Sequence, residues 1–456
     1  MGGAWQLALQ DKADVVVLEQ RDDVGGNAGS FEVDDIRVDY GSHRLHPACD
    51  TRILDDLRAL LGDDLLARPR HGRIRLRGHW IHFPLKPFDL ARHLPWSFTA
   101  GVARDALSKA VATKNGDSDP TFASVLRRGL GATICRDFYF PYARKIWGLA
   151  PEEISPIQAY RRVSAGSLTK MFRKIIRKTS TTPRGGTHFY YPRNGYGQIS
   201  RAIADAAIRS GADIRLGTKV HRIELGEPHQ IFTEHDGSQK IIHADHVWST
   251  IPVAALAKFI TPPPPTDVLD ASTRVESRSM ILIYLLLDEN QFTPYDAHYF
   301  PGSDVVLTRL SEPKNYSGRR DPEGRTVLCA ELPCAAGDEY WQMSDDALAD
   351  LVRDALARCR LEIRSTILRT TTKRLTHAYP IYRRGYDTHL GLLDDWVGGL
   401  DRFLTYGRQG LFVHDNTHHA LAMAYAAAEC LDRSGHFDRN RWIGYRAEFD
   451  QHVVED

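Results

Sequence analysis

The sequence lacks the features that would place it among membrane, secreted or zinc-binding proteins. No apolar run approaches the roughly 20 residues of a membrane-spanning helix, and no basic segment leads into an apolar one near the amino end, as in a signal peptide. The 6 cysteines are scattered, without a C-x-x-C pair or histidines at zinc-ligand spacing. We therefore predict a cytoplasmic protein with no membrane span, no disulfide framework and no bound metal.

Charge of one sign is also missing, because the formal net charge is only +1. No global field favours nucleic acid or an acidic membrane, so an anionic ligand has to be held by local arginines. A length of 456 residues with 42% hydrophobic composition is typical of two or three globular domains. These values predict no nucleic-acid partner, and they leave a small-molecule substrate and a homo-oligomer possible.

The amino-terminal segment carries the most informative pattern. An aliphatic strand at residues 15–18 ends at Glu19 and is followed by Gly25 and Gly26. A strand that ends in a carboxylate can hold the ribose of a dinucleotide by its hydroxyls. A helix at residues 4–9 precedes it, yet the strand and glycine-rich turn expected before that helix are not in the sequence. We expect such a unit to begin about 10 residues earlier, so a misplaced start or a trimmed chain would account for the pattern.

The remainder of the chain alternates between helical and strand patterns. Residues 30–39 predict a hairpin, residues 50–178 a mainly helical region that includes a basic run at 170–178, and Gly185 and Gly186 a break after it. Further helices are expected at 199–210, 345–358 and 420–431. Strands are expected at 213–216, 219–225, 230–234, 246–249, 280–287, 304–308 and 410–413.

Seven short motifs occur in an order that resembles one flavoprotein superfamily: amine oxidases, protoporphyrinogen oxidases and UDP-galactopyranose mutases, most of all the mutase branch. The motifs are the Gly25-Gly26 turn, the loop 40–43, the segment 142–148, Arg161, and the segments 308–314, 379–381 and 407–410. The resemblance runs from residue 4 to about residue 430 and implies FAD as cofactor.

The resemblance also implies an α/β fold with α+β elements. A discontinuous, Rossmann-like FAD-binding domain would comprise residues 1–47, 187–265 and 400–456. A mainly helical inserted domain (48–186) and a mixed or antiparallel sheet domain (266–399) would complete the chain, with the substrate between these two.

Individual residues are assigned by the same resemblance. In the mutases the matching residues hold a UDP-sugar over reduced FAD, and a departing diphosphate needs fixed guanidinium groups. Catalytic roles fall to His43, Arg309, Tyr379 and Trp147, and substrate binding to Arg161, Arg309, Tyr379, Trp147 and Tyr142. The predicted cofactor-binding residues are Glu19, Gly25, Gly26, Asn27, Gly41, Ser42, His43, Val220, Arg408, Asp415 and Asn416.

Each assignment has a plainer structural alternative. Arg309 could form only an ion pair with Glu312 or Glu331, and Trp147 and Tyr142 could simply pack in a helical core. Arg161 adjoins Arg162, and the sequence does not separate them. His43 could be a turn histidine, Glu19 a strand-end carboxylate and Tyr379 a strand-end aromatic. His414, His418 and His419 suggest a metal site only weakly, because no carboxylate or cysteine completes a ligand spacing.

The sequence also departs from the mutase pattern. His414, Asp415 and Asn416 stand where mutases have an aromatic hydroxyl and then acidic residues, Asn27 where relatives have arginine, and Ala424 where a glycine is expected. The most favoured function is a pyranose/furanose isomerase of a nucleotide sugar. An FAD-dependent oxidoreductase of the amine oxidase, protoporphyrinogen oxidase or desaturase type is the alternative, and an inactive or truncated homologue is the third reading.

Overall fold

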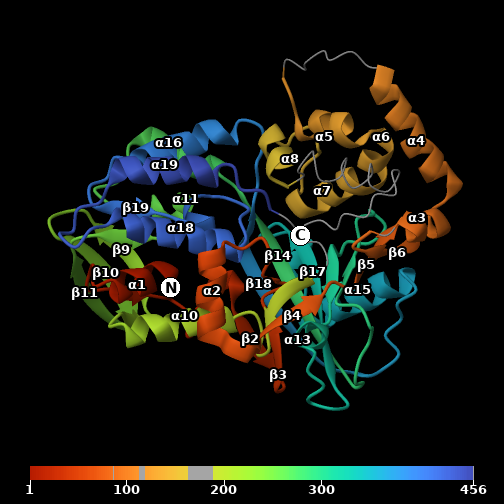
Figure 1. Cartoon of the computed structure of the whole chain (residues 1–456), viewed down its shortest axis with the longest axis horizontal. Coiled ribbons are helices and arrows are strands. Elements are labelled where there is room, and N and C mark those ends of the chain that lie inside the picture. The colour runs from red at the N-terminus through yellow and green to blue at the C-terminus, as the bar shows by residue number, and fades with distance from the viewer. Residues whose placement is uncertain (86, 112–118, 163–187, 455–456) are drawn as a thin grey trace.

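The computed structural model describes residues 1–85, 87–111, 119–162 and 188–454, which form a mixed α/β fold (Figure 1). The basic run at 170–178 and the break at Gly185 and Gly186 lie outside the described residues. In the part of the chain that is described, no helix combines the length and apolarity needed to cross a membrane.

One end of the molecule is built from parallel strand pairs and helices that are far apart in the sequence. Strand β1 (Val16–Leu18) pairs in parallel with β8 (Asp213–Arg215), and β12 (Val247–Ser249) with β19 (Phe403–Thr405). The helices that share their core are α1 (Gly2–Leu9), α2 (Thr51–Leu61), α10 (Gln198–Arg209), α18 (Thr417–Cys430) and α19 (Arg439–Phe449). The helix and strand predicted at the amino end are therefore confirmed, as are those predicted at 199–210 and 213–216.

The small residues of α18 allow a close approach of α1. A Cβ atom added at Gly2 would lie 3.0 Å from Leu421 Cδ2 and 3.3 Å from the Cβ of Ala424. A Cβ added at Gly3 would lie only 2.7 Å from the hydroxyl of Tyr406. The contact between the two helices therefore depends on small residues at Gly2 and Ala424.

A four-stranded sheet packs beside this unit in the order β11 (Ser238–Ala244), β10 (His229–His235), β9 (Lys219–Glu224) and β13 (Ile260–Thr261). Its core is shared with the helices α11 (Val253–Leu256), α12 (Thr266–Arg274) and α16 (Tyr386–Gly398). The strands predicted at 219–225, 230–234 and 246–249 are confirmed.

A seven-stranded sheet forms the centre of the rest of the molecule (Figure 1). Its order is β18 (Ile367–Pro380), β14 (Ser277–Leu287), β17 (Thr326–Cys334), β16 (Arg309–Ser311), β15 (Ala297–Tyr299), β5 (Gly72–Leu76) and β6 (His79–Phe83). Strand β14 is buried on both faces: Ile281 and Ile283 belong to one apolar cluster and Leu282 and Tyr284 to another. A continuous aliphatic run is typical of such a strand.

Shorter elements complete the fold. The hairpin β2 (Ser30–Val33) and β3 (Ile36–Asp39) lies where it was predicted, and β4 (Leu65–Pro69) pairs with β7 (His188–Pro192). The short helices α13 (Pro313–Ser317) and α14 (Glu339–Gln342) precede α15 (Asp345–Arg358), which confirms the helix predicted at 345–358. The helices α3 (Pro87–His93), α4 (Trp96–Val111), α5 (Phe122–Leu130), α6 (Ala132–Ile134), α7 (Phe140–Trp147) and α8 (Pro156–Arg162) gather at one end of the sheet (Figure 1).

The structure corrects three parts of the sequence prediction. Residues 65–83 form β4, β5 and β6 and not helix. In β5 the buried residues Gly72, Ile74 and Leu76 alternate with half-buried arginines, which is the period of a strand. The segment 410–413 is not a strand, since Phe412 has a φ of 52°. Residues 304–308 are irregular, and the strand begins at Arg309 itself.

The division into three domains stays a prediction. The sheet nevertheless joins segments that the prediction separated, because β5 pairs in parallel with β15.

Candidate functional site

The loop that follows β3 is held against the seven-stranded sheet by Glu331 of β17. Its Oε1 accepts hydrogen bonds from the backbone N–H of Ser42 and from Arg309 Nε, each at 2.9 Å, and Arg309 Nη2 lies 2.8 Å from the same oxygen. A Cβ added at Gly41, whose φ is +100°, would lie 3.3 Å from this oxygen. Glu331 therefore fixes both the loop and Arg309, and it is one of the two partners that the sequence proposed for Arg309.

His43 lies between this ion pair and a second arginine. Burial, followed by the positive charges of Arg309 and Arg408, lowers the pKa of His43 to about 3. Its ring stacks on Tyr196 at 5.3 Å between centroids, and Nδ1 is buried without a hydrogen-bond partner among the described residues. At neutral pH His43 is thus an uncharged imidazole in a positively charged surrounding.

Arg408 lies in the short helix α17 (Gly407–Gly410) and connects three segments. Its guanidinium donates hydrogen bonds to the carbonyl oxygens of Ala378 at 2.8 Å, Asp415 at 3.1 Å and His414 at 3.4 Å. The same group lies 5.6 Å from the ring centroid of Tyr379. Since Arg309 also acts electrostatically on Tyr379, both arginines border this ring of β18.

A row of rings extends from Tyr379 toward the helical region. His414 lies 6.2 Å from Tyr379 and 4.9 Å from Tyr382, between ring centroids. Arg161 Nη1 donates to the hydroxyl of Tyr382 at 3.3 Å, while its Nη2 lies 2.7 Å from Asp450 Oδ1. The side chain of Arg161 is only 12% exposed, which separates it from an ordinary solvated helix arginine.

Trp147 and Gln158 place polar atoms without partners beside this row. Trp147 is 5% exposed and meets His414 edge to face at 6.1 Å, and its indole N–H has no acceptor in the described chain. Gln158 is fully buried, three residues before Arg161 on α8, and neither of its amide atoms has a described partner. Tyr142 is partly buried and packs against Phe138 at 6.0 Å beside the helical core, and its role in substrate binding stays a prediction.

The residues expected to hold the adenosine part of a cofactor gather around the end of β1. Glu19 Oε1 accepts a hydrogen bond from the backbone N–H of Arg21 at 2.9 Å. Gly25 has a φ of +107°, and a Cβ there would lie 2.9 Å from Ser200 Oγ, whereas a Cβ at Gly26 would meet nothing within 4 Å. The turn is therefore packed tightly on one side and open at Gly26.

Two further predicted cofactor-binding residues, Asn27 and Val220, lie in the turn itself and in β9. Asn27 donates to the carbonyl of His377 at 3.2 Å, which ties the turn to β18. Val220 is half-buried in β9.

The start of α18 holds a cluster of imidazole groups around one buried carboxylate. The side chain of Asp415 is 1% exposed, and its Oδ2 lies 2.6 Å from His452 Nδ1. The ring of His419 stacks on His452 at 4.2 Å, and the backbone N–H of Asn416 donates to His419 Nδ1 at 3.3 Å. The three groups Asp415, His419 and His452 lie within 4.8 Å of one another.

The sequence reasoning found no carboxylate for this histidine cluster, although Asp415 adjoins His414. A separation of 2.6 Å between Oδ2 and Nδ1 is that of a hydrogen bond, because two ligands bonded to one zinc ion at about 2.0 Å lie farther apart. The absence of a metal stays a prediction.

The sequence prediction did not include Arg44, a buried cation in the loop that follows β3. Arg44 lies 3.3 Å from Asp296, and its guanidinium donates to the hydroxyls of Tyr299 and Tyr316 at 3.3 Å each. Arg44 stands in the same loop as His43, which was a signal available in the sequence. Its partners come from β15 and α13, and no local pattern marks them.

Comparison with known proteins gives this arrangement a family context. The family described as flavin-containing amine oxidoreductase matches residues 3–398. No curated protein sequence matches the chain.

Several solved structures share the fold. One is the crystal structure of a reduced UDP-galactopyranose mutase, with a TM-score of 0.79 at 18% identity, covering 100% of this chain and 97% of that one. A putative protoporphyrinogen oxidase from Exiguobacterium sp. 255-15 has a TM-score of 0.70 at 17% identity, covering 94% of this chain and 95% of that one. Cyclohexylamine oxidase from Brevibacterium oxydans IH-35A has a TM-score of 0.62 at 18% identity, covering 93% of this chain and 96% of that one.

Proposed function

Because the chain belongs to the flavin-containing amine oxidoreductase family, we propose that it is a flavoenzyme that isomerises a nucleotide sugar without net oxidation. FAD is its cofactor. The proposal rests on one observation: two guanidinium groups, Arg309 and Arg408, border the uncharged His43 and the ring of Tyr379. A site bordered by two guanidinium groups favours a substrate with negative charge.

The described residues fit a flavin dinucleotide at both of its ends. At the adenosine end, Glu19 directly follows β1, where its carboxylate would hold the ribose hydroxyls, and a Cβ added at Gly26 would meet nothing within 4 Å. At the other end, His43 Nδ1 and Asp415 Oδ1 are buried without a described hydrogen-bond partner, as expected where a ligand supplies one. When bound, FAD supplies a ring system that can act as nucleophile or as hydride acceptor.

The proposed substrate site extends from Arg309 to Arg161. Arg309 and Arg408 would hold the diphosphate and stabilise the charge that develops on it as it leaves the sugar. Glu331 and the carbonyls around Arg408 fix the two guanidinium groups in advance, so little reorganisation is needed. Tyr379 and Trp147 would flank the sugar, and the indole N–H would donate a hydrogen bond to it.

The neutral state of His43 determines how this side chain can act on a neighbouring group. An uncharged imidazole can orient a neighbouring group by a hydrogen bond while adding no charge of its own. Because burial and the two arginines hold its pKa at about 3, His43 would keep this state throughout the physiological range.

Oxidation of an amine fits this site less well. A protonated amine would approach Arg309 and Arg408, and like charges repel at this range. Glu331, the carboxylate beside Arg309, is already engaged by this arginine.

The test compares two reactions of the FAD-loaded chain. We expect interconversion of UDP-galactopyranose and UDP-galactofuranose after the flavin is reduced by dithionite, and no conversion with oxidised flavin. Release of hydrogen peroxide from an amine, or from another oxidisable substrate, without any sugar conversion would overturn the proposal and establish an oxidoreductase.

A further inference from the structure

A basic cavity lies on the face of the seven-stranded sheet opposite to Arg309. In the register of the sheet Arg73 pairs with His298, and His298 with Leu310, whereas Ile74, Tyr299 and Arg309 pair along the next row. Because neighbouring rows point to opposite faces, the side chains of Arg73 and Arg309 are separated by the sheet. The cavity beside Arg73, which has a volume of about 740 Å³, is therefore separated by the sheet from the proposed substrate site.

Arg73 is the best-fixed cation of this cavity. Its guanidinium carbon lies 4.2 Å from the ring centroid of Trp80 and 4.5 Å from that of Tyr295, so the group is held between two aromatic side chains. Nε is buried without a hydrogen-bond partner, and no carboxylate of the described residues lies within ion-pair distance of Arg73. Burial lowers the pKa of Arg73 below its ordinary value, against the opposing effect of a hydrogen bond with the neutral side chain of Tyr295.

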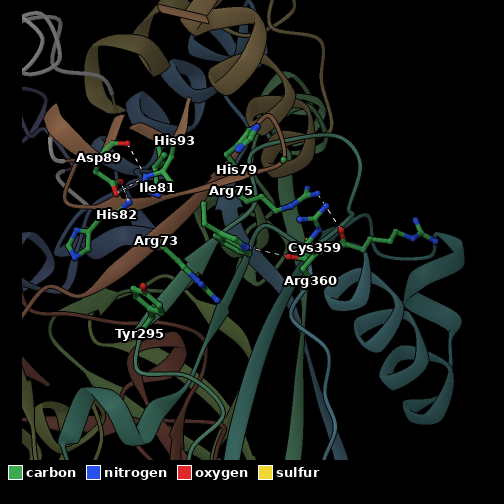
Figure 2. Close-up of a pocket in the computed structure, with 13 residues that line it drawn as sticks. Arg73, Arg75, His79, Ile81, His82, Asp89, His93, Tyr295, Cys359 and Arg360 are labelled. Carbon is green, nitrogen blue, oxygen red and sulfur yellow. Dashed lines mark hydrogen bonds and ion pairs between the residues drawn. The ribbon is translucent and has the colours of Figure 1, made fainter. Parts of the chain in front are cut away.

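Three further arginines line the cavity. Figure 2 shows Arg75 extending toward Cys359 and Arg360, where its guanidinium donates to the carbonyl oxygen of Arg358 at 3.4 Å. Arg75 pairs with Asp304, but Arg358 and Arg360 are exposed and have no ion pair within the described ranges. The cavity thus has an excess of positive charge at the end of α15.

The negative groups of the lining do not balance these cations. Asp89 is the one carboxylate among the described lining residues, and it is engaged by His93 at 3.0 Å and by the backbone N–H of His82 at 2.7 Å. Figure 2 shows these three residues grouped together, away from Arg360. The arginine side of the cavity is therefore open to an external anion.

We propose that this cavity binds a phosphate-bearing small molecule. Guanidinium groups match the oxygens of phosphate with paired donors. Three guanidinium groups without a carboxylate partner carry more positive charge than a ligand with a single carboxylate would neutralise, which favours phosphate. Arg73 supplies a preorganised contact, and Arg358 and Arg360 supply adaptable ones at the mouth. A free inorganic phosphate and a phosphate group of a larger metabolite share this chemistry.

The test measures pyrophosphate binding to the FAD-loaded full chain by calorimetry. We expect Arg73→Gln to weaken binding by about tenfold or more, Arg360→Gln to weaken it severalfold, and Arg364→Gln to leave it unchanged. Arg364 is the matched control, since its side chain is 88% exposed and it does not line the cavity. Thermal unfolding of each variant reports whether the fold is retained, and Arg360→Gln changes only an exposed side chain.

Two further measurements identify the location and source of the ligand. A change of affinity in Arg309→Lys but not in Arg73→Gln would place pyrophosphate at the flavin site and overturn the proposal. Absence of binding up to about 1 mM would also overturn it. Tighter binding of a sugar phosphate than of inorganic phosphate, lost in Arg73→Gln, would identify a metabolite as the source, and equal binding would identify the free ion.

Discussion

Arg309 and Glu331 form a buried ion pair in which two nitrogens of one guanidinium converge on a single carboxylate oxygen. The distances are 2.9 Å from Nε and 2.8 Å from Nη2, and the side chains are 17% and 4% exposed. Ser42 adds a third donor to the same oxygen at 2.9 Å. The pair therefore joins β16, β17 and the loop of His43 in one rigid unit.

Removing the carboxylate of this pair should destabilise the protein strongly. Glu331→Ala leaves the buried guanidinium of Arg309 without its counter-charge, and we expect the free energy of unfolding to fall by about 3–5 kcal/mol. Glu331→Gln retains two hydrogen-bond acceptor positions and should cost less. Urea denaturation measures both, with Glu362→Ala as control, because the Glu362 side chain is 61% exposed. An equal loss for Glu331→Ala and Glu362→Ala would contradict the role of the pair.

The buried histidine His298 predicts a specific loss of stability in acid. Burial, followed by the charge of Arg73, lowers the pKa of His298 from 6.5 to about 3. Between these two pH values the side chain is therefore protonated in the unfolded chain and neutral in the folded chain. The stabilisation is complete above pH 6.5 and is lost as the pH falls toward 3.

His298→Gln removes this titration. The slope of unfolding free energy against pH between 4 and 6 should become shallower by about 1.4 kcal/mol per unit. Leu310→Ala, at the position paired with His298, should lower stability at every pH and leave the slope unchanged. A His298→Gln slope equal to that of the unaltered chain would refute the assignment.

The cysteines should be unreactive in the folded chain. All 6 are free and buried, and burial is the main cause that raises the pKa of Cys49 to about 12 and those of Cys334 and Cys430 to about 11. Ellman's reagent should react slowly with the native protein and release all 6 equivalents promptly in guanidinium chloride. Rapid reaction of several thiols in the native protein would show that the packing described for these segments is wrong.

Much of the fold could be predicted because its signals are local. The aliphatic runs of β1 and β14 and the alternation of β2 and β3 each specify a strand, and the motif order indicated the flavoprotein superfamily. The strand β5 was missed because its alternation of Ile74 and Leu76 with arginine is short, and one of its two neighbours in the sheet, β15, is more than 200 residues away in the sequence. Phe412 was assigned to a strand from its apolar neighbours, although the turn after α17 requires a positive φ there.

The roles of the candidate site residues stay predictions, and the contacts that join these residues in the structure could not be predicted from the sequence. Glu331 was one of two possible partners of Arg309, and only the pairing of β16 with β17 selects it. Arg44 acquires its partners from β15 and α13, and Asp415 acquires His452 from the far end of the chain. Such contacts depend on long-range packing, which a single sequence does not encode in any local pattern.

The most direct test of the proposed function is the affinity of the reduced, FAD-loaded chain for UDP-galactose, measured by calorimetry in the unaltered protein and in Arg309→Ala. Loss of a charge-assisted contact to the diphosphate should weaken binding by more than about tenfold, and Arg309→Lys should recover only part of it. Arg364→Ala serves as the exposed control. Equal affinity in Arg309→Ala and the unaltered protein would contradict the central claim that Arg309 holds an anionic substrate beside the flavin.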